Sequence, residues 1–286
     1  MFKLQRMQIS KLRIREGNVK MKKTIIVILM LYMVINFIGC NSETPPAEPK
    51  EPAPKETILL AVAASLKNCI DGELIPMFTE KYPNITVDAT YDSSGKLQIQ
   101  IEEGADVDVF MSAAMKQMDA LNEQGLIKEG TMVELLENKI VLILPKDSTT
   151  EIASFEDILK AETIAVGDPD SVPAGQYAKE SFENLGMWAD VEAKASLGTN
   201  VTEVLSWVAA GSADAGVVYA TDAASNENVK VVTEAPEGSV SKVIYPIGII
   251  DATTKLKAAQ NLTEFLQSEE ALTIFEKYGF TARRKK

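Results

Sequence analysis

The chain has 286 residues, a formal net charge of −12 and no histidine. The absence of histidine excludes a Ser-His-Asp triad, a histidine-ligated zinc site and a histidine general base. The excess of acidic residues excludes nucleic acid as a partner, because binding to a phosphate backbone needs clustered positive charge.

Residues 1–39 are predicted to be a signal peptide. Residues 21–23 form a short basic segment, and residues 24–38 form an apolar run that is too short to span a membrane comfortably. Cys40 follows directly after a glycine. This order resembles a bacterial lipoprotein signal, and the resemblance implies a lipid on Cys40 and a location at the extracytoplasmic face of the cell membrane. An uncleaved anchor helix is the alternative, and it also tethers the protein to a membrane. Residues 1–20 are polar, basic and without pattern, and we hypothesise that they come from a mis-assigned start; a tryptic peptide from them in native protein would contradict this.

Residues 40–56 are predicted to be an extended, semi-rigid linker. They contain five prolines with Glu and Lys and no aromatic residue, so they cannot form a core. Without residues 1–39, the chain has 21 basic and 40 acidic residues, a formal charge of −19. The layout is that of a globular body held near a membrane by a lipid and a spacer.

The body of the chain, residues 57–286, is long enough for one large or two small domains. It contains one cysteine, Cys69, so we expect no intramolecular disulfide and a small buried side chain at that position. Strands are predicted at 57–63, 85–91, 107–110, 139–144, 163–166, 215–219, 229–232 and 245–250. Helices are predicted at 66–80, 96–103, 114–123, 178–185, 201–210, 254–266 and 269–278. Short buried strands that alternate with helices indicate an α/β fold with largely parallel sheets.

Two long apolar stretches, 138–145 and 241–250, lie where the chain could cross between two lobes. We therefore predict a first lobe from residues 57–137 plus 246–286 and a second lobe from 138–245. Two lobes with two crossing strands make a hinge over a central cleft, where ligands bind in such folds. A single α/β domain is the alternative.

Strand ends followed by helix starts recur along the chain, and they are rich in Ser, Thr and Gly. In chain order these corners are 63–66, 91–96, 167–176 and 196–201. A single Ser at such a corner is by default a helix cap. Several helix N-termini at strand ends, however, indicate positive dipole ends directed at one anion site. A further strand end, 217–222, carries the Tyr219 hydroxyl, although strand tyrosines are more often packing residues.

The corner within 166–177, which reads VGDPDSVPAGQY, is the most informative. Proline fixes φ and glycine allows positive φ, so the run predicts one rigid backbone path into the next helix. Unpaired N–H groups at that helix start suit an anion. A turn that only connects a strand to a helix is the alternative.

Neutral N–H and O–H donors are sufficient to hold a fully deprotonated oxyanion. A protonated anion such as hydrogen phosphate would also need an acceptor, and Asp92 is the carboxylate beside a corner. Lys67 and Lys96 follow two of the corners and are expected in solvent. The sequence leaves open whether these three side chains face the cleft.

These corners resemble those of the periplasmic molybdate-binding proteins of ABC importers. The segments that carry the resemblance are AASLKN at 63–68, SSGKL at 93–97, VGDPDSVPAGQYAKE at 166–180, GVVYATDA at 216–223 and KYGF at 277–280. The resemblance extends over essentially all of 57–281, and 166–180 is its most specific piece.

The resemblance implies the type II periplasmic-binding-protein fold, in which two α/β lobes joined by a two-strand hinge close on a tetrahedral oxyanion. The ligand contacts it implies are the hydroxyls and amides of Ser65 and Ser94, the backbone amides of Ala174 and Val201, and the hydroxyl of Tyr219. Departures lie beside these positions. Asp92 and Lys67 stand where smaller uncharged residues are common, and Gly95 replaces a third hydroxyl residue that some members carry.

The sequence therefore predicts a monomeric, lipid-anchored solute-binding protein that binds molybdate or tungstate and delivers it to an ABC permease and its ATPase. No enzyme activity, no cofactor and no metal cation are expected; the metal enters only within the oxyanion. The alternatives are a binder of sulfate, thiosulfate or phosphate, for which Asp92 would favour phosphate, and an oxyanion-sensing lipoprotein without transport. A phosphotransferase is a weaker alternative, because the chain lacks a Gly-x-x-x-x-Gly-Lys-Ser/Thr loop and histidine.

Overall fold

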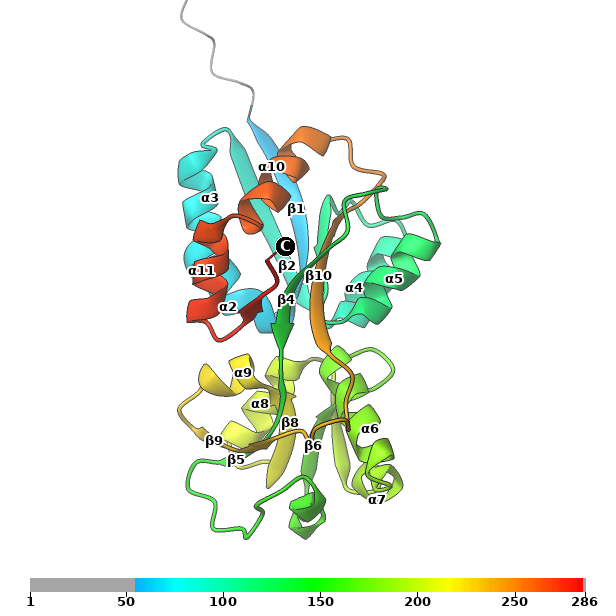
Figure 1. Ribbon diagram of the computed structural model, residues 1–286, viewed down its shortest axis with the longest axis vertical. Helices are drawn as coiled ribbons and strands as arrows, with labels where there is room; N and C mark the ends of the chain where they lie inside the picture. Colours follow the sequence, from blue (N-terminus) through cyan, green and yellow to red (C-terminus); the bar gives the residue numbers. More distant parts are fainter. Residues whose placement is uncertain (1–54, 285–286) are drawn as a thin grey trace, which may run out of the picture. The chain divides into compact units, whose positions relative to one another are not determined.

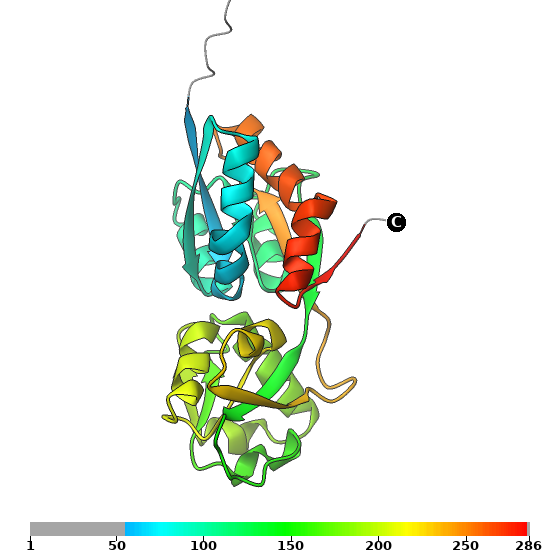
Figure 2. The same ribbon diagram turned by 90° about the vertical axis from the view of Figure 1, so that its left-hand side faces the viewer.

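The computed structural model of the chain describes residues 55–284 (Figure 1). The predicted signal peptide, Cys40 and nearly all of the predicted linker lie outside the described residues. Within them, the chain forms two mixed β-sheets with helices on both faces of each (Figures 1 and 2). The predicted α/β class is confirmed, but the expectation of largely parallel sheets is wrong, because five of the nine strand pairings of the described residues are antiparallel.

The first sheet has the strand order β11-β4-β10-β3-β1-β2. Its strands are β1 (Glu56–Ala63), β2 (Ile85–Asp92), β3 (Val109–Met111), β4 (Val133–Asn138), β10 (Val243–Ile249) and β11 (Thr281–Ala282). β1 is parallel to β2 and β3, whereas β10 is antiparallel to β3 and β4. The helices around it are α2 (Lys67–Cys69), α3 (Ile75–Lys81), α4 (Ser94–Glu102), α5 (Met115–Glu123), α10 (Leu256–Leu266) and α11 (Glu269–Lys277).

The second sheet has the strand order β7-β6-β8-β5-β9. Its strands are β5 (Ile140–Pro145), β6 (Ile164–Gly167), β7 (Ala195–Gly198), β8 (Ala215–Tyr219) and β9 (Val229–Glu234). β6 is parallel to β7 and β8, and β5 is antiparallel to β8 and β9. The helices around it are α6 (Pro173–Asn184), α7 (Trp188–Glu192), α8 (Val201–Ala209) and α9 (Ala220–Ala224).

The described chain passes between the two sheets at two places. β4 ends at Asn138 in the first sheet and β5 starts at Ile140 in the second, and β9 leads back into β10. β10 pairs with β4 from Val243 onward, whereas the predicted second lobe runs to residue 245. Where one lobe ends within this crossing stays a prediction.

The local sequence explains how the helices near the strand ends start and pack. The apolar residues of α8 recur at i, i+3, i+4 and i+7, and all four are buried. Asn200 caps α8 by accepting from the Glu203 amide, and Ser93 caps α4 by accepting from the Lys96 amide. The caps and the buried face of α8 therefore fix both helix starts beside the strand ends.

Cys69 is buried as expected, and burial raises the pKa of its thiol to about 12.

Candidate functional site

A small cavity lies where strand ends of the first sheet meet helix starts of the second. The five site residues expected from the sequence all line it: Ser65, Ser94, Ala174, Val201 and Tyr219. The cavity volume is about 10 Å³, close to the space that one water molecule needs. The structure thus brings together residues that lie up to 154 positions apart in the sequence.

The sheet register explains why the corners meet. Ala63 at the end of β1 is the parallel partner of Asp92 at the end of β2, so the segments after both strands emerge side by side. In the second sheet β6 is parallel to β7 and to β8, so the loops that lead into α6, α8 and α9 leave from the same edge. Carboxyl ends of parallel strands are where ligand sites form in open α/β sheets.

Ser65 does not cap a helix; its hydroxyl lies 3.0 Å from the Tyr245 hydroxyl. Tyr245 also accepts a hydrogen bond of 3.2 Å from Asn138 Nδ2, and Asn138 Oδ1 accepts from the Lys139 amide. Either hydroxyl can donate in the Ser65–Tyr245 bond. When Tyr245, which accepts from Asn138, donates to Ser65, the Ser65 proton remains available for a group in the cavity.

Ser94 is prepared in a similar way. It is fully buried, and its hydroxyl oxygen accepts a hydrogen bond of 3.0 Å from the Ala113 amide. A serine hydroxyl has one proton to donate, so this arrangement leaves the Ser94 proton free. Tyr219 donates to the Ala113 carbonyl over 3.4 Å, a long bond that a better acceptor could replace. The protein thus occupies acceptor capacity of both serines and leaves their donors for an anion.

The loop after β6 is rigid, but not for the reason expected from the sequence. The expectation that its glycines supply positive φ is wrong, because neither Gly167 nor Gly175 has a positive φ. A Cβ on Gly175 would lie 1.9 Å from the Gly167 carbonyl oxygen. The glycines therefore serve close packing of the α6 start against the end of β6. Pro173 opens α6, and the first-turn amides that follow it have no partner within the helix.

The charged residues near the cavity are held by other groups. Asp92 lines the cavity, but its carboxylate accepts from the Ser93 amide and lies 3.4 Å from Lys96 Nζ. The Lys67 ammonium lies 5.1 Å from the centre of the Tyr91 ring. Neither Lys67 nor Lys96 lines the cavity. The donors that face the cavity are therefore neutral hydroxyls and backbone amides.

Burial keeps the hydroxyls protonated. It raises the pKa of Tyr219 and of Tyr245 above their usual range, so both remain donors at neutral pH. Burial also raises the pKa of Asp222, three residues after Tyr219, to about 7. Oδ2 of Asp222 has no hydrogen-bond partner among the described residues. An acid that titrates near neutrality therefore lies close to both tyrosines.

Sequence reasoning missed Tyr245, Asn138 and Asp222 as members of this site. Tyr245 and Asn138 lie in apolar stretches whose pattern indicates only strands that cross between lobes. Asp222 lies in the first turn of a short helix, where an acidic residue is common. Nothing local to these positions indicates that they lie near Ser65 and Tyr219. The one available signal was that Tyr245 and Asn138 place a hydroxyl and an amide in otherwise apolar strands, where buried polar groups need partners.

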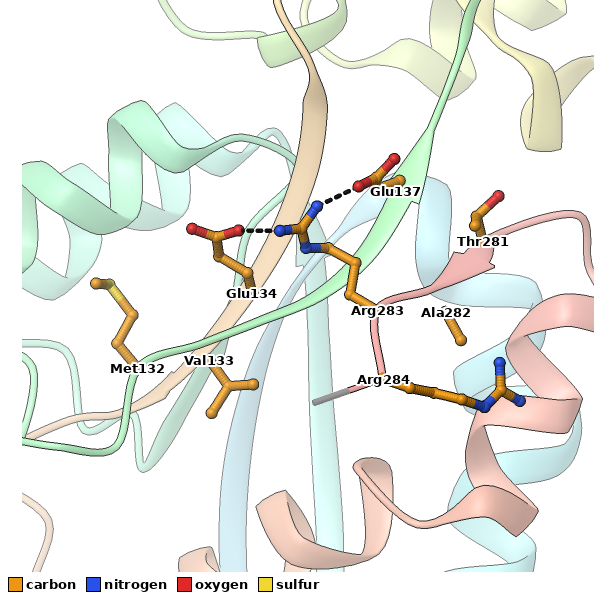
Figure 3. Close-up of a pocket in the computed structure, with 8 residues that line it drawn as sticks. All are labelled: Met132, Val133, Glu134, Glu137, Thr281, Ala282, Arg283 and Arg284. Atoms are coloured by element: carbon orange, nitrogen blue, oxygen red, sulfur yellow. Dashed lines mark hydrogen bonds and ion pairs between the residues drawn. The ribbon is translucent and has the colours of Figure 1, made fainter. Parts of the chain in front are cut away.

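A larger groove of about 550 Å³ lies beside β4 and β11 (Figure 3). It contains none of the expected site residues, and its charges pair with each other. Arg283 forms ion pairs with Glu134, over 2.7 Å, and with Glu137 (Figure 3), and Arg284 pairs with acids of α11. Because these pairs satisfy the charges of the groove, the small cavity is the better candidate site despite its size.

Residues 55–284 contain no cluster of three or more His, Cys, Asp or Glu side chains that could hold a metal ion. In the same part of the chain, no helix is both long enough and apolar enough to cross a membrane.

Comparison with known proteins gives consistent results. The family model described as bacterial extracellular solute-binding protein matches residues 58–281. YvgL of Bacillus subtilis, provisionally named an ABC transporter substrate-binding lipoprotein, is 40% identical over 91% of this chain and 99% of its own. The molybdate-binding protein ModA of Escherichia coli is 34% identical over 79% of this chain and 89% of its own. The periplasmic molybdate-binding protein of Azotobacter vinelandii superposes with a TM-score of 0.70 at 20% identity, over 79% of this chain and all of that structure, and so shares the fold.

Proposed function

The chain belongs to the family of bacterial extracellular solute-binding proteins, and from this premise we propose that it binds molybdate, and also tungstate, and delivers it to an ABC importer. The observation that carries the proposal is the donor arrangement of the cavity. The Ser94 oxygen accepts from the Ala113 amide, which leaves the Ser94 proton free, and Ser65 has a free proton when Tyr245 donates to it. The helix starts at Ala174 and Val201 add amides.

A donor set of this kind favours a fully deprotonated tetrahedral oxyanion. Hydrogen phosphate would need an acceptor for its proton, and Asp92, the one carboxylate among the residues that line the cavity, contacts the Ser93 amide and Lys96 through Oδ1. A sulfate or thiosulfate binder remains the alternative of the same chemical class. Binding involves no bond making or breaking, so the proposed role is not enzymatic.

We propose that ligand entry requires the two sheets, with their helices, to separate as lobes about the β4–β5 and β9–β10 crossings. The cavity volume of about 10 Å³ is too small for a tetrahedral oxyanion. Its walls come from both lobes, so a small rotation at the crossings opens it. Function is then the greater stability of the closed, liganded arrangement over the open one.

We also propose that the protein works as a monomer anchored by a lipid on Cys40, with the permease and ATPase of an importer as partners. The relative YvgL carries lipoprotein in its name, and the sequence order around Cys40 fits. The wild type should incorporate a labelled fatty acid, and replacing Cys40 by Ser should abolish that incorporation. A wild type that incorporates no label but stays with the membrane would argue for the uncleaved anchor helix.

Calorimetry on the purified, desalted protein with molybdate, tungstate, sulfate and phosphate in turn tests the proposed function. We expect tight one-to-one binding of molybdate and tungstate and no heat from the other two. Preference for sulfate or phosphate would keep the binding role but change the ligand. Absence of binding by all four ions would contradict the proposed oxyanion site.

Ser65→Ala and Ser94→Ala should each weaken molybdate binding by about 1–3 kcal/mol, because a charged acceptor loses a buried donor. That is roughly a 5- to 150-fold rise in Kd, which the same calorimetry measures. Ser268→Ala is the matched control, since Ser268 caps α11 far from the cavity. Unchanged affinity in Ser94→Ala would remove that residue from the ligand set.

A further inference from the structure

Hydrogen bonds join the two lobes beside the cavity without lining it. The Gly95 amide at the start of α4 donates to the Ser171 carbonyl over 3.0 Å. Gln117 Nε2 on α5 donates to Gln176 Oε1 on α6 over 3.1 Å. Gly95 and Gln117 belong to the first lobe, and Ser171 and Gln176 to the second. Separation of the lobes in the proposed hinge motion would break both contacts.

The contact at Gly95 leaves no room for a side chain. A Cβ on Gly95 would lie 2.4 Å from the Ser171 carbonyl oxygen, 2.8 Å from its Cα and 2.9 Å from its carbonyl carbon. These are backbone atoms, which a rotamer change cannot remove. The Ser171 backbone is itself fixed, because the amides of Ser171 and Val172 both donate to the Asp168 carbonyl.

The restriction at Gly95 comes from the opposite lobe and not from its own backbone. Gly95 lies in the first turn of α4 and does not have a positive φ, so alanine fits the helix. Alanine is in fact the better helix former. Any effect of a side chain here must therefore come from the approach of the second lobe.

The glutamine pair contributes less to closure. It forms one hydrogen bond and leaves Gln117 Oε1 and Gln176 Nε2 buried without a partner among residues 55–284. A buried unpaired donor and acceptor offset the gain from one bond. The Gly95–Ser171 contact is thus the stronger of the two interlobe contacts.

We propose that Gly95 sets how far the lobes close, and thereby the affinity and residence time of the oxyanion, without touching it. The inference rests on the proposed function. Its physical basis is that only a residue without Cβ lets the α4 start meet the Ser171 carbonyl. A side chain at residue 95 holds the lobes apart, which lengthens every donor contact made from the second lobe.

Gly95→Ala tests the inference, with Gly72→Ala as the matched control. Gly72 is exposed, lies in the first lobe, and its Cβ would meet only the end of the Tyr278 side chain at 3.2 Å. We expect Gly95→Ala to bind molybdate about tenfold more weakly, mainly through faster dissociation. The melting temperature of Gly95→Ala without ligand should not be lower than that of the wild type, because alanine favours the helix. Wild-type affinity in Gly95→Ala would overturn the inference.

Hydrogen exchange at residue 95 separates this inference from the proposed function. In the wild type the Gly95 amide is protected by Ser171, and we expect it to exchange at least tenfold faster in Gly95→Ala, after correction for the intrinsic rate of alanine. Gly72→Ala should leave residue 95 protected. This readout is made on the ligand-free protein and tests the arrangement that the structure describes, in which the Gly95 amide donates to Ser171. Failure of the wild type to bind molybdate would overturn the proposed function alone, whereas unchanged protection in Gly95→Ala would overturn the closure role of Gly95.

Discussion

Gly175→Ala is expected to lower the free energy of unfolding by about 3 kcal/mol and to abolish oxyanion binding. The added Cβ would lie 1.9 Å from the carbonyl oxygen of Gly167 and 2.4 Å from its carbonyl carbon. Gly167 is the last residue of β6 and pairs with Gly198 of β7, so it cannot retreat without breaking the sheet. The α6 start must move instead, and the Ala174 amide moves with it out of the cavity.

Urea unfolding and molybdate calorimetry measure the two effects of Gly175→Ala. Gly72→Ala controls for the general effect of a glycine-to-alanine change. A Gly175→Ala protein with wild-type stability and affinity would contradict the close packing of α6 against β6. Retained stability with lost binding would show that the α6 start shifts as a unit while the core stays intact.

Asp222 should lower the stability of the protein by up to about 4 kcal/mol as the pH rises from about 4 to about 7, and Asp222→Asn should remove this contribution. Burial raises the pKa of Asp222 from 3.8 to about 7 in the folded protein. Below pH 4 the carboxyl is protonated in the folded and unfolded states alike, so it does not make the stability depend on pH. Between these values the folded state binds a proton that the unfolded state has released, so stability falls as the pH rises. Above pH 7 the folded protein carries a buried charge and the loss is complete.

Urea unfolding of wild type and Asp222→Asn at several pH values between 4 and 8 measures this slope. Subtracting one curve from the other removes the contributions of all other acids. Asp190→Asn, which removes an exposed carboxylate on α7, controls for the change in net charge. Parallel curves for wild type and Asp222→Asn would mean that Asp222 is ionised in the folded protein at low pH.

Much of the fold followed from local pattern. The apolar periodicity of 201–210 predicted α8, and the strand and helix alternation predicted the α/β class, because both patterns reflect burial on one face or in one sheet. β4 and β7 were not predicted. β4 carries Glu134 and Glu137, which are satisfied by Arg283 from the far end of the chain. β7 is an edge strand that pairs only with β6, and its small and polar residues show no burial pattern.

The sequence by itself determined which residues stand at the strand ends, since short apolar runs followed by Ser, Gly and Pro mark where strands end and helices start. The lining of one cavity by Ser65, Ser94 and Tyr219 could therefore be predicted. Tertiary structure alone decided which hydroxyl protons are free and how closely the lobes meet. Tyr245 is 180 residues from Ser65 in sequence, and Ser171 reaches Gly95 from the other lobe. Such partners leave no local pattern, because a hydrogen bond or a steric limit depends on distance in space and not on position along the chain.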